Sequence, residues 1–235
     1  MSLRFSYVKL FGKIALSMLP YLKVENLSCF RSDKALFQDL KFDVLPGQNL
    51  EILGSNGSGK TTLLRILLGL LKPDAGSIFW LDDQQNYNNY RTFSCFYQGH
   101  QLAVKNLLTV AENIQMTKAS KNIDIEAISK CISRVGLIDP HEYASNLSVG
   151  QRKRISIARW LLDFHKIYFI DEPFSALDDE ATQLIQDLIL DLNSKGSSFV
   201  ITGHRPSGIE ATHILSLIHI SSPRDVEESR MPSSA

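Results

Sequence analysis

Short apolar runs recur along the chain at the length of buried strands. Residues 166–170 and 198–202 consist mostly of isoleucine, valine and aromatic side chains, and residues 48–53 are predicted to form a third strand. Runs of this kind, bounded by turn residues or acids, are typical of strands covered on both faces in a parallel sheet. We therefore predict an α/β fold with a mostly parallel core sheet.

Other segments alternate between apolar and polar residues. The clearest alternation lies at 40–44, and further strands are predicted at 21–27, 77–81 and 93–97, with a turn at 31–34. An alternating pattern indicates strands with one face toward a core and the other toward water. We expect an antiparallel β subdomain beside the parallel sheet, and a last strand at 212–218.

Helical spacing governs the remaining segments. A helix is predicted from Thr61 to about Leu71 and another over 179–192. Between them, 108–114 opens with a threonine and a glutamate three residues later, which is a capping-box pattern, and 123–135 has apolar residues three and four apart. We interpret the range of about 102–162 as a small α-helical insert.

The predicted organisation is one domain with two extensions. Residues 1–17 form an N-terminal extension, 18–218 form the single α/β domain, and 219–235 are rich in serine, proline and charge and form a disordered tail. The basic and apolar mixture of the extension leaves a membrane-surface role open.

Composition narrows the class of protein. The chain has 235 residues, 44% of them hydrophobic, and a formal net charge of zero, so no whole-chain field favours nucleic acid. Cys29, Cys95 and Cys131 are far apart, and we interpret them as small buried residues in a reducing compartment. No apolar run approaches the ~20 residues of a membrane-spanning helix, so work at a membrane requires an embedded partner.

The strongest chemical motif follows the strand at 48–53. Residues 54–61 fit the pattern G-x-x-x-x-G-K-[ST] of the phosphate-binding P-loop, and a helix begins at once. Glycines let backbone N–H groups point inward toward phosphate oxygens, and the helix dipole adds positive charge there. Lys60 can reach the β- and γ-phosphates, and the Thr61 hydroxyl can ligate Mg²⁺. The predicted nucleotide-contacting residues are Gly54, Ser55, Asn56, Gly57, Ser58, Gly59, Lys60, Thr61 and Thr62.

Two adjacent acids end the strand at 166–170. Asp171 is placed to hold the hydration shell of Mg²⁺ near Thr61, and Glu172 to polarise an attacking water. The alternative is that both acids only cap the loop that follows. About twenty residues upstream, Ser148 and Gly150 lie at a predicted helix N-terminus, which is a second anion-binding position.

Together these motifs resemble the ATP-binding cassette (ABC) ATPases over roughly residues 21–218. Residues 147–151, Leu-Ser-Val-Gly-Gln, are similar to the family's LSGGQ signature, with Val149 in place of its first glycine. The resemblance implies the following further roles: Glu172 as catalytic base, His204 as the switch histidine at the γ-phosphate, Asp178 in the D-loop, and Ser148, Gly150 and Gln151 in the signature loop.

Two assignments within the resemblance have rivals. Gln98 and Gln101 both end a strand before the helical insert, and Gln101 is favoured as the Q-loop ligand of nucleotide and Mg²⁺ because 109–113 follows it at nearly the family distance. Phe30 is a candidate to stack on adenine, but it is about one residue out of register and is equally well explained as a core residue.

The resemblance implies a homodimer that sandwiches two ATP molecules with Mg²⁺. Residues 54–65, 99–101 and 202–206 are similar to the ATPase subunits of bacterial cytochrome c maturation systems. That likeness implies two integral inner-membrane partners, a peripheral place on the cytoplasmic face of that membrane, and ATP-driven delivery of heme to a periplasmic chaperone. It implies no nucleic-acid partner and no direct heme ligand. The alternatives are the ATPase of another ABC importer or exporter, a soluble ABC protein outside transport, and a nucleotide-binding scaffold without turnover.

Overall fold

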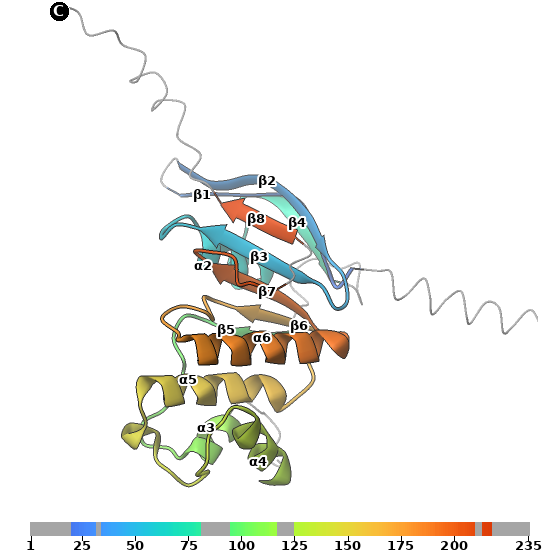
Figure 1. Ribbon diagram of the computed structural model, residues 1–235. Coiled ribbons are helices and arrows are strands. Elements are labelled where there is room, and N and C mark those ends of the chain that lie inside the picture. The colour runs from blue at the N-terminus through green and yellow to red at the C-terminus, as the bar shows by residue number, and fades with distance from the viewer. Residues whose placement is uncertain (1–19, 32–33, 81–94, 117–124, 210–212, 218–235) are drawn as a thin grey trace, which may run out of the picture.

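The computed structural model describes residues 20–31, 34–80, 95–116, 125–209 and 213–217 (Figure 1). The predicted extension 1–17 and tail 219–235 lie outside the described residues, so those domain limits stay predictions.

Two sheets form the upper part of the molecule as drawn in Figure 1. The first is antiparallel, with the order β2-β1-β4, and contains β1 (Leu22–Arg31), β2 (Lys34–Val44) and β4 (Ala75–Trp80). The second is parallel, with the order β5-β6-β7-β3-β8, and contains β3 (Asn49–Gly54), β5 (Cys95–Gln98), β6 (Ile167–Ile170), β7 (Ser198–Gly203) and β8 (His213–Leu217). The predicted pair of sheets is confirmed.

The parallel sheet separates two apolar cores. On β6, Ile167 and Phe169 pack with α2 (Lys60–Leu67) and the antiparallel sheet, whereas Tyr168 and Ile170 face the helices on the other side. Successive strand residues point to opposite faces, so a strand buried on both sides must be apolar throughout. This is the physical reason for the unbroken apolar run at 167–170.

Four helices accompany the second core. They are α3 (Val110–Gln115), α4 (Ile125–Arg134), α5 (Val149–Ala158) and α6 (Asp179–Ser194). Figure 1 shows α6 beside β6, with α5, α3 and α4 in turn farther from the sheet. Short 3₁₀ turns at Ala144–Asn146 and Arg159–Leu161 flank α5. The Thr109–Glu112 capping box is present, as the sequence predicts.

The first predicted helix is shorter than expected. It ends at Leu67 instead of near Leu71, because Gly69 adopts a positive φ of 68° and the chain turns away.

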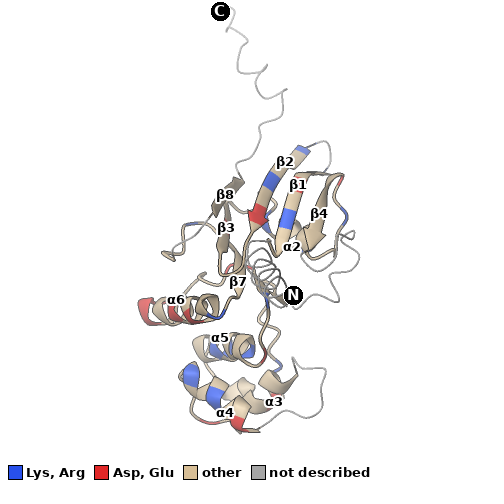
Figure 2. Ribbon diagram, turned by 90° about the vertical axis from the view of Figure 1, so that its right-hand side faces the viewer, with Lys and Arg blue, Asp and Glu red and all other residues tan. Residues whose placement is uncertain are grey.

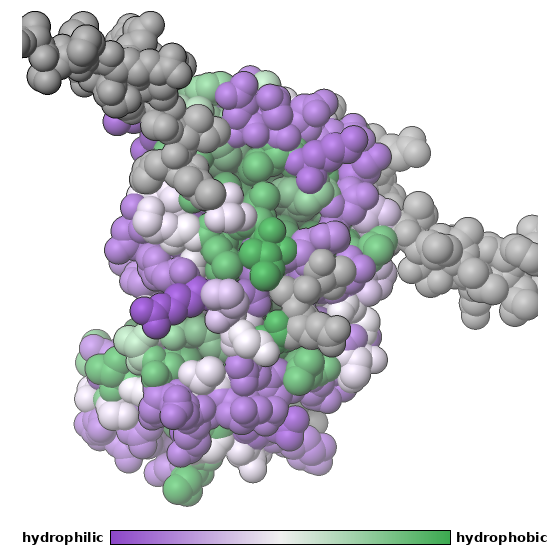
Figure 3. Space-filling model, turned by 45° about the horizontal axis from the view of Figure 1, so that its top comes forward, coloured by the Kyte–Doolittle hydropathy of each residue, from purple (hydrophilic) through white to green (hydrophobic). Residues whose placement is uncertain are grey.

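None of the helices in the described ranges is long and apolar enough to cross a membrane. On the face shown in Figure 3, apolar residues in the middle are bordered by hydrophilic ones.

Candidate functional site

The P-loop joins the end of β3 to α2. Gly57 and Gly59 have φ values of 80° and 98°, which glycine adopts without strain. Ser55, Asn56 and Gly57 are exposed at the rim, whereas the buried hydroxyl of Ser58 has no hydrogen-bond partner among the described residues. A side chain at Gly54 would meet the Leu217 carbonyl oxygen at 2.9 Å. Exposed backbone at the rim and a positive helix start together form a cradle that fits phosphate.

Lys60 lies under this cradle and is 5% exposed. Its ammonium donates hydrogen bonds to the carbonyl oxygens of Gly54 at 2.8 Å and Ser55 at 3.1 Å. It also lies 3.3 Å from Glu172 Oε1. The ammonium is thus surrounded by oxygen atoms that phosphate oxygens could replace.

The first residue of α2 after Lys60 meets the end of β6. The Thr61 hydroxyl donates to Asp171 Oδ2 at 2.8 Å, although the two residues are 110 positions apart in the chain. The Thr202 hydroxyl donates to Asp171 Oδ1 at 2.6 Å. The structure therefore brings Thr61 and Asp171, the predicted metal-binding pair, together. The Thr202 hydroxyl holds the other oxygen of the Asp171 carboxylate in place.

A magnesium ion fits this pair in part. Hydroxyl and carboxylate oxygens are the donors that Mg²⁺ prefers, and the ion commonly keeps water and phosphate ligands besides one or two protein groups. Among the described residues, no group of three or more His, Cys, Asp or Glu side chains could hold a metal ion alone. The donor set suits a metal that arrives with a nucleotide.

Glu172 lies where protonatable and cationic groups converge. Its Oε1 is 3.2 Å from His204 Nε2 and 3.3 Å from the Lys60 ammonium, and its Oε2 is 3.9 Å from His100 Nδ1. The residue has a φ of 54°, a conformation that costs a residue with a side chain about 1–3 kcal/mol. The Glu172 N–H donates to the Thr202 hydroxyl at 2.9 Å, which supports the strained turn.

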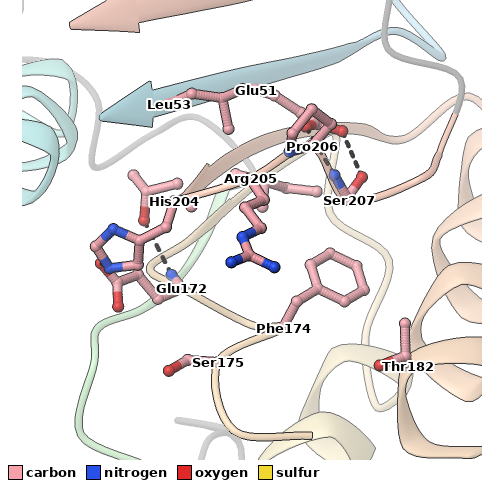
Figure 4. A pocket seen from close by; sticks show the side chains of 13 residues that line it. Glu51, Leu53, Glu172, Phe174, Ser175, Thr182, His204, Arg205, Pro206 and Ser207 are labelled. Atoms are coloured by element: carbon pink, nitrogen blue, oxygen red, sulfur yellow. Dashed lines mark hydrogen bonds and ion pairs between the residues drawn. The ribbon is translucent and has the colours of Figure 1, made fainter. Parts of the chain in front are cut away.

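The Glu172 and His204 side chains line a cavity of about 450 Å³ (Figure 4). Its other walls come from β3, β7, α6 and the loops after β6 and β7, and Arg205 extends its guanidinium into the space. Because the cavity adjoins the catalytic candidates, a change in its walls can alter how they are held.

The signature loop lies at a different cavity. Ser148 caps α5, accepting from the Gln151 N–H at 3.2 Å while its own N–H donates to Gln151 Oε1 at 2.9 Å. Ser148, Gly150, Gln151 and Asp178 line a space of about 440 Å³ that contains no P-loop residue. Ser148, Val149 and Gly150 are all exposed. Within one copy, the signature loop and the P-loop therefore do not form one site.

Charges tie this cavity's two helices together. Figure 2 shows acidic residues at the start of α6 and basic residues on α5. Arg154 of α5 pairs with Glu180 of α6 at 2.8 Å. Asp178 caps α6, accepting from the Ala181 N–H at 2.8 Å. The D-loop and the signature helix are thus held next to each other.

The two Q-loop candidates differ in environment. Gln98 is 9% exposed, and its Oε1 accepts from the indole N–H of Trp160 at 2.8 Å. Gln101 is exposed and lines a third cavity of about 470 Å³. Because the Gln98 side-chain oxygen is already bonded inside the protein, Gln101 remains the better candidate, and its nucleotide role stays a prediction.

Phe30 is not the core residue that one sequence interpretation allowed. It is 45% exposed near the end of β1, where its N–H donates to Asp74 Oδ2 at 2.6 Å. Exposure leaves the ring available for stacking, which stays a prediction.

Among the cysteines, Cys29 and Cys131 are buried as expected, whereas Cys95 is half-buried. Burial raises the pKa of the Cys95 thiol to about 11.

Sequence reasoning missed two neighbours of Glu172. Thr202 joins Asp171 to the Glu172 backbone, and His100 approaches the carboxylate from the segment after β5. A threonine directly before Gly203 at the end of a buried strand is a weak signal, because only the parallel pairing of β6 with β7 shows where it points.

Comparison with known proteins places these features in a family. The model of the family described as ABC transporter matches residues 37–175. The chain is 34% identical over 196 residues to the cytochrome c biogenesis ATP-binding export protein CcmA of Aliivibrio fischeri, covering 82% of this chain and 96% of that protein. It is 36% identical over 194 residues to the protein of the same name from Nitrosomonas europaea, covering 80% and 91%.

Solved structures show the same fold. A putative ABC transporter ATP-binding protein from Pyrococcus furiosus matches with a TM-score of 0.74 at 22% identity, covering 83% of this chain and 96% of that one. The dimeric post-hydrolysis state of an ATP-binding cassette bound to ADP and Pi matches with a TM-score of 0.66 at 25% identity, covering 78% and 88%.

Proposed function

Because the chain belongs to the ABC transporter family of ATP-binding cassettes, we propose that its ATP hydrolysis drives heme export in cytochrome c maturation. The binding of ATP and its hydrolysis are properties of the family. The finer assignment rests on one observation, the 34–36% identity to cytochrome c biogenesis ATP-binding export proteins over 80% or more of the chain.

The arrangement of side chains supports a direct hydrolytic mechanism. Lys60 would exchange its carbonyl and Glu172 contacts for β- and γ-phosphate oxygens, and this exchange frees the Glu172 carboxylate. Glu172 then accepts a proton from a water molecule, and the oxygen of that water bonds to the γ-phosphorus. At the same time the bond between the γ-phosphorus and the bridging oxygen of the β-phosphate breaks. His204, 3.2 Å from Glu172, would orient the carboxylate and the γ-phosphate.

Magnesium would be held by Thr61 and Asp171, with Gln101 as a further candidate ligand. Bound there, the ion would neutralise charge on the phosphates. The Thr202 hydroxyl keeps the Asp171 carboxylate oriented toward Thr61. These roles follow from the donor chemistry and from the 2.8 Å contact between Thr61 and Asp171.

Two copies would complete each site. The signature residues Ser148 and Gly150 are exposed and line a different cavity from Glu172 and His204. A second copy in head-to-tail orientation would supply them to the phosphate held by Lys60. Val149, 70% exposed, would then face the partner without altering the Ser148 cap.

The transport assignment places the protein on the cytoplasmic face of the bacterial inner membrane, bound to two integral subunits. The test is affinity purification of the tagged protein from solubilised native membranes, followed by mass spectrometry. We expect cytochrome c maturation membrane subunits to be recovered. Recovery of an unrelated permease would assign this ATPase to another transporter. Recovery of ribosomes or repair factors would overturn the transport role.

A matched pair of variants sharpens this test. Leu107, within the predicted helical insert, is 88% exposed, whereas Ile214 on β8 is 57% exposed. We expect Leu107→Asp to lose the membrane subunits and Ile214→Asp to keep them. Loss with both variants would indicate a general defect and would not support docking at the helical insert.

A further inference from the structure

The loop that carries His204 is fastened at Ser207. Glu51, in the middle of β3, is 2% exposed, and its carboxylate accepts hydrogen bonds from the Ser207 N–H at 3.0 Å and from the Ser207 hydroxyl (Figure 4). On the other side, Gln186 of α6 donates to the Ser207 carbonyl at 2.7 Å. Ser207 is therefore tied both to the strand that feeds the P-loop and to α6.

The loop runs along a cavity instead of packing into a core. The space of about 450 Å³ under it is lined by Leu53, Phe174, Thr182 and Arg205, among others. Three of the loop's residues, His204, Arg205 and Pro206, are exposed. With little packing around it, the loop depends for its position on the hydrogen bonds at Ser207.

The turn after Ser207 is also constrained. Gly208 has a φ of 80°, and a Cβ there would lie 2.9 Å from Gln186 Nε2. The Ile209 N–H donates to the Ser207 hydroxyl at 3.2 Å. Ser207 thus organises the loop from within and joins it to its surroundings.

The buried Glu51 carboxylate is held by hydrogen bonds from Ser207. Within the described part of the chain no cation pairs with it, and burying a carboxylate without a cation costs stability unless hydrogen bonds compensate. The hydrolytic mechanism gives it no direct part. Among the described residues, its two side-chain hydrogen bonds both come from Ser207, three residues after His204.

The geometry points to Glu51 as a positioning residue for His204. By holding Ser207, Glu51 sets where His204 lies relative to Glu172, whose Oε1 is 3.2 Å from His204 Nε2. This inference rests on the proposed role of His204 and Glu172 in hydrolysis. Through Ser207, Glu51 connects β3, the strand before the P-loop, to the loop that carries His204. The P-loop and His204 are therefore both held by β3.

The test compares steady-state hydrolysis and ATP binding in the full-length protein. Glu51→Gln keeps the side-chain size but offers one acceptor oxygen in place of two. We expect kcat to fall about tenfold or more, with the KM for MgATP changed less than about twofold, because only the placement of His204 is altered. Ser207→Ala should lose activity similarly, and Ser207→Thr, which keeps the hydroxyl, should restore it.

The matched control is Gln183→Ala, an exposed change on the same helix as Gln186, which should behave like the native protein. Native kcat in both Glu51→Gln and Ser207→Ala would overturn the inference, as would a loss of ATP affinity equal to the loss of kcat. If Glu51→Gln does not fold, the Ser207→Ala and Ser207→Thr pair decides. If the native protein hydrolyses no ATP, the proposed hydrolytic function is wrong. That result differs from a failure of the Glu51 inference, in which the native protein is active and the variants are too.

Discussion

At the scale of single residues, Glu172 is the centre of the site. Its backbone is strained, with a φ of 54°, and its carboxylate touches Lys60 and His204. Strain of about 1–3 kcal/mol persists only where neighbours hold it. Here the Thr202 hydroxyl does so, because it accepts from the Glu172 N–H and donates to Asp171.

Thr202→Val therefore tests this support. The valine fills the same space but leaves the Glu172 N–H and an Asp171 oxygen without a partner. We expect a loss of about 1–3 kcal/mol in the free energy of unfolding. We also expect kcat to fall up to about 100-fold, as for a misplaced catalytic group. Urea denaturation and hydrolysis assays measure both.

Thr182→Val is the matched control, since Thr182 lines the same cavity and its hydroxyl has no part in holding Glu172. Native hydrolysis by Thr202→Val would show that Glu172 is positioned without this hydroxyl.

The sequence motifs identified the groups at this scale unevenly. The P-loop could be predicted because its glycines and lysine lie within a few positions and shape their own backbone. Thr202 could not, because its bond to Asp171 spans 31 positions and depends on strands β6 and β7 lying side by side. Likewise, only the structure shows that the Gln98 side chain is bonded to Trp160.

At the scale of elements, the end of α5 holds the helical insert together. Arg159 is 6% exposed, and its guanidinium donates to the carbonyl oxygens of Leu102, Ala103 and Asn113 at 3.0–3.1 Å. Burial lowers the pKa of this guanidinium from its usual value. One side chain thus joins the signature helix to α3 and to the segment that follows Gln101.

Arg159→Lys keeps the charge but not the planar fork of donors. The lysine leaves some of these carbonyls without partners, so we expect a loss of about 1–3 kcal/mol. Amide hydrogen exchange should accelerate at 102–105 and in α3 but not in α6. Arg134→Lys, at a half-exposed pair with Asp191, is the control; equal exchange in both variants would contradict this role.

His165 predicts a pH dependence of stability. Its ring packs against Phe96 and Tyr168 at centroid distances of 5.5 Å, and burial lowers the pKa of His165, while Asp163 opposes this shift. A lowered pKa in the folded state means that the neutral form is favoured. The stability that neutral His165 contributes is therefore complete above the pKa of the unfolded state, about 6.5. It is lost as the pH falls through the pKa of the folded state.

Urea denaturation at pH 7.5 and 5.5 measures this dependence. The native protein should lose more stability between the two values than His165→Gln, while the exposed His141→Gln should match the native protein. An equal loss in His165→Gln would contradict the assignment.

Element types could be predicted from periodicity, because strand burial and helical faces are local patterns. Element ends were less predictable: α2 stops at Leu67 because Gly69 takes a positive φ. The capping box at Thr109 was predictable because its two partners are three residues apart.

At the scale of the whole molecule, the catalytic candidates and the signature loop line separate cavities. The sequence alone could show that both motifs exist, but only the fold shows that one copy does not bring them together. A dimer has two equivalent sites if each copy gives its P-loop to one and its signature loop to the other.

Mixing two inactive variants tests this composite site most directly. Lys60→Ala removes the phosphate contact from one copy, and Ser148→Arg blocks the signature loop of the other. Each variant alone should hydrolyse almost no ATP. An equimolar mixture should recover about a quarter of native activity, because half of the dimers are mixed and each has one intact site. No recovery on mixing, or native activity in Ser148→Arg alone, would contradict a site shared between two copies.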